Sequence, residues 1–296
     1  MVYDSVARMR LVVTVKSYPQ PSRKYSESVC VAGIRTDTSL PEWVRLYPIL
    51  FRDLPADQQF KKWSEIELDV SKSSDTRPES VKPDPSTMRV LRHIGTASNW
   101  AKRMELVEPL VIGSMCEALQ RQAETGASLA AFRPAEVLNV SSDNEDPDWS
   151  EGDRNSLSQM NLFAQGKVML EKIPWRWQYH YSCGDDCVTT RRIHRQTIID
   201  WEVAAAWRKW RHNYGSSRAA EAVRRKWFEQ ICAQDRDPVF LVGNQYQHLA
   251  SFLVLGVCWP KKTPLGDLRC AQGRFDFAGH LDDDLSMTRD RESLDT

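Results

Sequence analysis

The sequence predicts an α+β protein whose core is a mainly antiparallel, barrel-like β-structure with helical insertions. Strand-like segments fill the first hundred residues, a helical period follows in the middle of the chain, and two more strands come near its end. We expect the N-terminal strands and a C-terminal hairpin to close one barrel-like core, because closure removes exposed sheet edges.

Four segments of the N-terminal part are rich in β-branched residues or alternate between apolar and polar ones, and they are expected to be strands: 10–18, 28–35, 43–49 and 64–72. In the last of these, apolar side chains from Ile66 to Val70 alternate with acidic ones. One face of this strand is therefore predicted to be buried and the other to face water.

The apolar spacing becomes helical over residues 99–125, where Pro109 predicts a break and Gly126 a stop. The elements expected after this helix are a short strand at 135–140, an aromatic strand at 174–181, helices at 198–211 and 217–231, and a hairpin of 238–243 with 251–260. Asp200 is expected to cap the first of these two helices.

Composition divides the chain into a β-rich part with a helix near 99–125, an acidic linker, an α+β part with a Cys/His site, and a disordered acidic tail, at residues 1–140, 141–158, 159–280 and 281–296. One domain and two domains separated at the linker both remain open.

The formal net charge of zero conceals an uneven distribution. Residues 141–158 carry a net charge of −5 and residues 281–296 a net charge of −4, so the rest of the chain carries +9. A positive body is compatible with a polyanionic partner, because Lys and Arg at phosphates release condensed counterions. The alternative is an ordinary solvated surface with two acidic segments.

Class and location follow from composition. The chain has 296 residues and a hydrophobic fraction of 41%, enough to fill a core. It has no apolar run long enough to cross a bilayer, and its start does not have the layout of a secretory signal. We expect a cytoplasmic protein with no membrane partner, in which most of the seven cysteines are reduced.

Several enzyme signatures are absent from the sequence. It contains no Walker loop, no Gly-x-Gly-x-x-Gly, and no His-x-Glu combined with Cys-x-x-Cys. Nucleotide hydrolysis by a P-loop and zinc-dependent deamination are therefore disfavoured.

Basic and aromatic residues alternate in several turn-rich segments. Basic groups hold phosphates and aromatic rings stack on unpaired bases, so this composition predicts nucleic-acid binding. The residues concerned are Lys16, Tyr18, Lys24, Tyr25, Arg45, Tyr47, Arg52, Lys61, Lys62 and Arg77, with Asn244 and Gln245 as amides that can pair with a base edge. The alternative is that the rings belong to the core and the charges solvate turns.

Two carboxylates flank Arg77 on a Pro-containing segment after a predicted strand. Asp75 and Glu79 are candidates for a catalytic pair in which one stabilises a cationic sugar and the other activates water, and Asp53 competes for the same role. The alternative is a loop held by an ion pair between Arg77 and a carboxylate.

A candidate metal site follows the aromatic strand. Its four large rings, from Trp175 to Tyr181, share one face that is expected to be core, while the opposite face turns to solvent or ligand. Cys183, Cys187 and His194 come next and suit a structural zinc ion, against the alternative of free buried thiols. The fourth ligand is left open among His180, Cys232, Cys258 and Asp185.

Several of these stretches resemble a group of largely uncharacterised bacterial proteins, and the resemblance covers most of residues 10–262. The stretches include "KSYPQPSRKYSESVCVAGI", "WVRLYPILFRDL", "DTRPES" and "FLVGNQ" with "LGVCWP". The group is similar to antiviral DNA glycosylases, which remove modified bases from phage DNA. In those relatives a Gly-His pair follows the second cysteine, and "CVTTRRIH" departs from that spacing.

The resemblance implies a hydrolase that flips a modified base, cytosine included, out of phage DNA and cleaves its N-glycosidic bond, with no cofactor required for the chemistry. The alternative functions are a non-catalytic reader of modified nucleotides and an RNA-acting or regulatory module.

Overall fold

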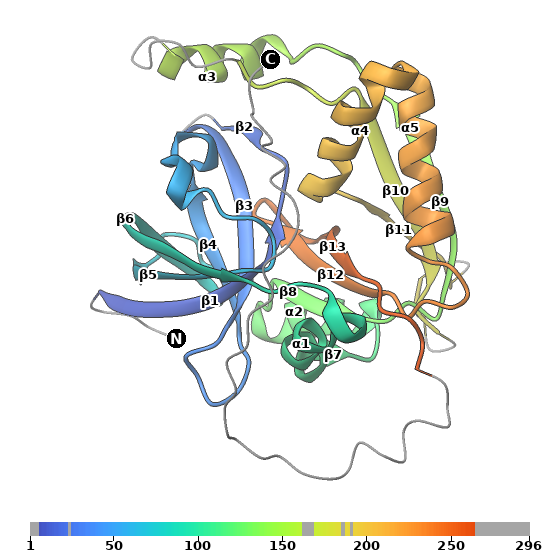
Figure 1. Cartoon of the computed structure of the whole chain (residues 1–296), viewed down its shortest axis with the longest axis horizontal. Coiled ribbons are helices and arrows are strands. Elements are labelled where there is room, and N and C mark those ends of the chain that lie inside the picture. The colour runs from blue at the N-terminus through green and yellow to red at the C-terminus, as the bar shows by residue number, and fades with distance from the viewer. Residues whose placement is uncertain (1–5, 23–24, 162–168, 185–186, 190–191, 264–296) are drawn as a thin grey trace. The chain divides into compact units, whose positions relative to one another are not determined.

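Five strands from the first third of the chain close a β-barrel (Figure 1). The computed structural model describes residues 6–22, 25–161, 169–184, 187–189 and 192–263. The barrel strands are β1 (Ala7–Lys16), β3 (Ser26–Arg35), β4 (Trp43–Ile49), β5 (Ser64–Lys72) and β6 (Ser80–His93). The predicted α+β class and barrel-like core are confirmed.

The strand order around the barrel is β1–β5–β6–β4–β3, and the ring closes by pairing of β3 with β1. The β4–β6 pair is parallel and the other four pairs are antiparallel. In barrel numbering the order is 1-4-5-3-2 with a parallel pair between strands 3 and 5, which is the order of the oligonucleotide/oligosaccharide-binding (OB) barrel. A short strand, β2 (Gln20–Ser22), extends the edge beside β3.

Alternation along the strands fills the barrel. In β1, Met9, Leu11 and Val13 point inward and are buried to 2% exposure or less, and Ile66 and Leu68 of β5 lie opposite Leu11 and Met9. The acidic residues between them face outward, where Arg8 pairs with Glu67 and Asp69. The two-residue period of this segment, predicted from the sequence, is confirmed.

Two further sheets and most of the helices belong to the rest of the chain. One sheet has the order β13-β12-β8-β7 and the other β11-β10-β9. Their strands are β7 (Val111–Ile112), β8 (Leu129–Phe132), β9 (Glu136–Asn144), β10 (Trp175–Ser182), β11 (His194–Thr197), β12 (Val239–Gln245) and β13 (His248–Cys258). The helices are α1 (Ala97–Val107), α2 (Met115–Thr125), α3 (Glu151–Asn161), α4 (Trp201–Tyr214) and α5 (Ser216–Arg225). Over the part of the chain that the structure describes, no helix is long and apolar enough to span a bilayer.

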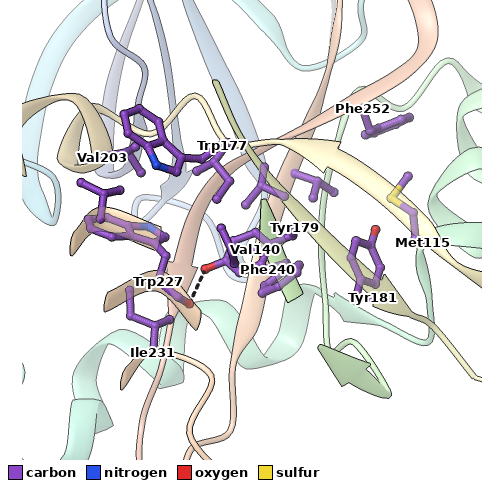
Figure 2. Close-up of a cluster of buried hydrophobic side chains, with 14 of the residues drawn as sticks. Met115, Val140, Trp177, Tyr179, Tyr181, Val203, Trp227, Ile231, Phe240 and Phe252 are labelled. Carbon is purple, nitrogen blue, oxygen red and sulfur yellow. Dashed lines mark hydrogen bonds between the residues drawn. The ribbon is translucent and has the colours of Figure 1, made fainter. Parts of the chain in front are cut away.

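The aromatic strand β10 is a core strand, as its sequence predicts. Trp177, Tyr179 and Tyr181 are almost fully buried, and Figure 2 shows them packed with Phe240 of β12 and Trp227. The buried polar tips have partners: the Tyr179 hydroxyl donates to the Trp227 carbonyl, and the Trp177 indole to a carbonyl of α5. The rings therefore fill the space between this sheet, α5 and the hairpin and do not offer a stacking platform.

The C-terminal hairpin packs against the outside of the barrel and does not supply one of its five strands. Ala32 and Ile34, on the outer face of β3, share a core with Leu129, Leu241 and Leu255 of the β13-β12-β8-β7 sheet. The approach is close, because a Cβ at Gly243 would lie 2.6 Å from a methyl of Leu255 and 2.9 Å from one of Leu129. This contact covers the β3–β4 face, on which OB barrels commonly bind ligands.

Some elements differ from the sequence prediction. Residues 80–93 form the longest barrel strand, which was not predicted from the sequence because Pro83 and Pro85 argue against a strand. The helix predicted over 99–125 is two helices, separated by a short turn that contains Pro109 and by β7, and Gly126 ends the second with φ 76°. Part of the predicted acidic linker lies in β9 and part in α3. The predicted tail, 281–296, lies outside the described residues.

A buried ion pair connects the barrel to α4. The Lys62 ammonium, just before β5, lies 2.7 Å from Asp200, and both side chains are less than 10% exposed. Asp200 also caps α4 by accepting from the Glu202 N–H, as predicted. Burial raises the pKa of Asp200, and the neighbouring Lys62 ammonium opposes that shift and favours the carboxylate. Gly256 leaves room for the pair, since a Cβ there would lie 3.2 Å from the Lys62 nitrogen.

Asp200→Asn is expected to lower the free energy of unfolding by about 3–5 kcal/mol, because Asn keeps the helix cap but leaves a buried ammonium without its closest counter-charge. Urea unfolding at pH 7 measures this loss. The double variant Lys62→Met with Asp200→Asn should recover part of the stability. A single variant within 0.5 kcal/mol of the parent protein would contradict the role of the pair.

Candidate functional site

Three cysteines and one histidine from different elements converge in the second half of the chain. Cys116 is the second residue of α2, Cys183 directly follows β10, Cys187 lies in the next loop, and His194 begins β11. The β10–β11 register places His194 opposite Tyr181, so the end of one strand and the start of the next meet. The four potential ligand atoms all lie within 4.8 Å of one another.

The spacing of these four atoms fits a tetrahedral ion. The Cys116 sulfur lies 3.6 Å from that of Cys183 and 3.8 Å from that of Cys187. The Nε2 atom of His194 lies 3.1, 3.2 and 3.6 Å from the sulfurs of Cys183, Cys187 and Cys116. Zn–S bonds of about 2.3 Å at tetrahedral angles would separate two sulfurs by about 3.8 Å. The cluster can therefore hold a metal ion such as zinc.

Neighbouring groups orient the cluster. The His194 ring stacks on Tyr181 with centroids 5.2 Å apart, and the Cys187 sulfur lies 2.9 Å from the Thr189 hydroxyl. Burial raises the pKa of the Cys183 thiol to about 12. At Cys187 burial also raises the pKa, but hydrogen bonds, first those with Thr189 and then those with the Cys183 and Cys116 thiols, outweigh it and lower the pKa. Burial lowers the pKa of His194, which favours the neutral imidazole that binds metals.

The sequence identified three of these four residues. Cys183, Cys187 and His194 lie together as expected, and the fourth member is Cys116, which was not considered because it lies 67 residues before Cys183. Two of the other candidates lie elsewhere: His180 bonds the Ser141 hydroxyl, and Cys232 bonds the Trp227 carbonyl. Cys258 lies in the core shared with the barrel. Asp185 lies outside the described residues.

The segment predicted to be catalytic, 73–79, joins β5 to β6. Asp75 is buried and accepts three side-chain hydrogen bonds and one backbone hydrogen bond from Arg77. Burial raises the pKa of Asp75, but these hydrogen bonds outweigh it and lower the pKa overall. This is the loop-holding ion pair that the sequence left open as the alternative.

The other two predicted carboxylates have different surroundings. Glu79 accepts hydrogen bonds from the backbone N–H and the hydroxyl of Ser128, at 2.8 and 2.7 Å. Asp53 is exposed at the end of a short 3₁₀ turn after β4. Glu79 lines a cavity of about 350 Å³, which it shares with Glu42, Trp43 and Arg121. We refer to it as the Trp43 cavity.

Half of the predicted nucleic-acid contacts are buried, less than 10% exposed, and bonded within the chain: Lys16, Tyr18, Arg45, Lys62, Arg77 and Asn244. Arg45 donates to the Cys30 sulfur and to Ser128, and Arg77 donates to the Asn244 carbonyl. Lys16 lies between the rings of Phe51 and Trp201. These polar groups hold the barrel to the elements that cover it.

The remaining residues of that set reach the surface to different degrees. Lys61 and Gln245 are exposed, and Tyr25, Tyr47 and Arg52 are half-buried. Tyr25 meets Tyr47 edge-on with centroids 6.0 Å apart, and Arg52 pairs with Glu27. Lys24 lies outside the described residues. The sequence missed Tyr246, whose ring is 57% exposed and lies 5.8 Å from the Arg77 guanidinium.

Fold and site together define a class: an OB-type barrel joined to an α+β part that carries a Cys₃His metal-binding cluster. The chain belongs to the family described as "Domain of unknown function (DUF8757)", whose model matches residues 111–276. A second family model, "Domain of unknown function (DUF8758)", matches residues 7–109, which contain the barrel. The two models meet near residue 110, before β7.

Comparison with curated proteins finds no match. One solved structure, titled "Structure of murine DNA binding protein bound with ds DNA", is similar at a TM-score of 0.29 and 9% identity, over 87% of this chain and 97% of that one. A likeness of this size supports no inference about the present chain.

Cys116→Ser is expected to lower the affinity for a divalent metal at least about 100-fold, because loss of a ligand exceeds the 10- to 100-fold cost of losing an outer-shell partner. Metal content after dialysis against graded chelator, measured by elemental analysis, tests this. Cys232→Ser is the matched control and should retain the ion. Equal retention by both variants would contradict the four-ligand assignment.

Proposed function

We propose that this protein binds a single strand of nucleic acid, or a nucleotide extruded from a duplex, at the end of its OB barrel that carries the loop 73–79. The observation that carries the proposal is the strand order. In OB barrels, the loops joining strands 1 to 2 and strands 4 to 5 bind oligonucleotides. Here those loops are residues 17–25, whose sequence contains Tyr18, Lys24 and Tyr25, and residues 73–79, which contain Arg77. Because β1 and β5 are antiparallel, the two loops follow strands that finish at opposite ends of the barrel, and the proposal concerns the end with residues 73–79.

The covering of the β3–β4 face limits where such a ligand can bind. Ala32, Ile34 and Arg45 on that face are buried against the β13-β12-β8-β7 sheet, so a strand has access to the 73–79 loop end of the barrel instead. Tyr246 supplies an exposed ring there, beside Arg77. Base–aromatic stacking does not depend on sequence, because every base has a π-face.

Charge at the same end supports the proposal. Lys72 ends β5 and Lys82 lies near the start of β6, and both are exposed. The register places Lys82 opposite Ser71, next to Lys72. Two exposed ammonium groups at the turn between β5 and β6 fit a phosphate backbone, and their contribution to binding falls as salt screens their charge.

We propose further that the bound strand is DNA with a modified base, cytosine in phage DNA among the candidates, and that the protein removes the base in antiviral defence. The supporting observation is the Trp43 cavity, in which an indole suited to stacking lies with the carboxylates of Glu79 and Glu42. Water would add its hydroxyl to C1′ and pass its proton to the departing base, leaving an abasic site. Glu79 would stabilise the cationic sugar.

The Cys₃His cluster is proposed to hold a structural zinc ion. Four protein ligands close the coordination sphere, as in structural zinc sites, whereas catalytic sites keep one position for water. When bound, zinc would supply a cross-link between α2 and the β10–β11 end of the sheet, and the chemistry proposed at Glu79 does not require it.

Tyr246→Ala is expected to weaken binding of a labelled single-stranded oligonucleotide about tenfold, within the range of about 1–3 kcal/mol for one stacked base. Fluorescence anisotropy at low salt, with DNA and RNA of the same sequence, measures the effect. Tyr214→Ala removes a similarly exposed ring, 54% against 57%, from the end of α4 and is the control. Equal affinities of the two variants would exclude the loop end as the binding site.

Glu79→Gln is expected to reduce formation of abasic sites in phage DNA with modified cytosine by about 10²-fold or more, as for loss of a catalytic carboxylate. Alkaline cleavage of the treated DNA detects the sites, and Glu221→Gln on the exposed face of α5 is the control. If the parent protein forms no abasic sites while DNA binding persists in Glu79→Gln, the protein is a reader and the excision step is wrong.

A further inference from the structure

We infer that a second cavity, beside the metal cluster, binds the phosphate group of one nucleotide. The cavity has a volume of about 570 Å³ and is lined by residues 194–196 of β11, residues 248–252 of β13, and Met115 and Leu119 of α2. We call it the β11–β13 cavity. It is separate from the Trp43 cavity, with which it shares no lining residue.

The β11–β13 cavity lies where the edges of two sheets separate. β11 is an edge strand of the β11-β10-β9 sheet, and β13 is an edge strand of the β13-β12-β8-β7 sheet. The two strands meet at the Ile198–Val254 bridge and at a hydrogen bond from the Ile199 N–H to the Val254 carbonyl. On the side of this bridge toward His194 and His248, the described residues show no further backbone pairing between β11 and β13. The cavity occupies the space between the two strands there.

The charge of the lining favours an anion. Arg195 and His248 are exposed at the cavity, and His194 contributes to its wall. None of the described residues that line it is Asp or Glu. A guanidinium offers a planar set of donors that matches the oxygens of a phosphate, and no carboxylate is present to compete for it.

The second nitrogen of His194 provides a more specific argument. Nε2 faces the three sulfurs, so the ring would bind a metal through that atom. Metal-bound histidines almost always donate their other N–H to an acceptor. Among the described residues Nδ1 of His194 has no hydrogen-bond partner, although the residue is only 7% exposed and lines the cavity. A phosphate oxygen in the cavity would accept this N–H.

The rest of the lining suits the remainder of a nucleotide. Phe252, Leu249, Met115 and Leu119 present apolar surface, and Leu249 is 42% exposed. Apolar walls with a few convergent donors are typical of sites for small organic anions. An ion as small as inorganic phosphate would leave that surface uncovered, so a nucleotide is the better match.

The link from this site to a nucleic-acid strand rests on the proposed function. Tyr246 is in the turn of the hairpin, two residues before His248, and its ring lies beside Arg77 of the 73–79 loop. Two residues span at most about 7 Å. A strand that stacks on Tyr246 can therefore place its next phosphate in the β11–β13 cavity.

The test uses the full-length, zinc-loaded protein with four probes: inorganic phosphate, thymidine, thymidine monophosphate and a twelve-residue oligothymidylate. Thymidine monophosphate is expected to bind at least tenfold more tightly than thymidine and to shift the Nδ1 resonance of His194 in ¹⁵N-histidine-labelled protein. Arg195→Gln and His248→Gln should each weaken its binding about fivefold or more. Arg176→Gln, an exposed arginine on β10 of the same sheet, is the control and should have no effect.

The outcomes separate this inference from the proposed function. If Arg195→Gln binds the oligonucleotide as the parent does while Tyr246→Ala binds it weakly, the cavity inference is wrong and the barrel proposal stands. If the monophosphate binds and depends on Arg195 but no oligonucleotide binds, the cavity is a site for free nucleotides and the barrel proposal falls. No shift of His194 with any phosphate-bearing probe would overturn the inference.

Discussion

The contact between the outer face of the barrel and the β13-β12-β8-β7 sheet is the constraint on which the rest of the structure depends. Its apolar part joins β3 to β8, β12 and β13, and its polar part consists of buried cations at Arg45, Lys62 and Arg77. A buried cation is stable only when other parts of the chain satisfy it. Ser128, Asp200 and the Asn244 carbonyl do so, and these partners fix how the two parts of the chain meet.

This constraint also decides what surface remains for ligands. A barrel whose broad face is closed by its own chain keeps only its loop end and the margins of the covering sheets. The two cavities lie at such margins, one between β4 and α2 and the other between β11 and β13. For the proposed function, this arrangement favours recognition of one or two nucleotides over tracking of a long strand across the barrel.

The sequence predicted most of the regular elements because their apolar periods are local, as in β5 and β10. It missed β6 because the cost of Pro83 and Pro85 depends on where their missing N–H groups would point, which only the sheet determines. It identified Cys183, Cys187 and His194 from their proximity in the chain but not Cys116 on α2. The burial of Arg45 and Arg77 could not be predicted either, because a basic residue in a strand or a turn looks the same in the sequence whether it faces water or another sheet.

The long separation between Cys116 and His194, 78 residues along the chain, bears on how the protein is made. A ribosome releases residues in order, so α2 emerges well before the strand that carries the last ligand. Until His194 has been released, Cys116 lacks one of the other three residues of the cluster, and the metal cross-link proposed between α2 and the β10–β11 end of the sheet cannot form. The barrel, whose strands end at residue 93, has all its pairing partners by then, so synthesis alone orders its assembly ahead of the part that carries the Cys₃His cluster.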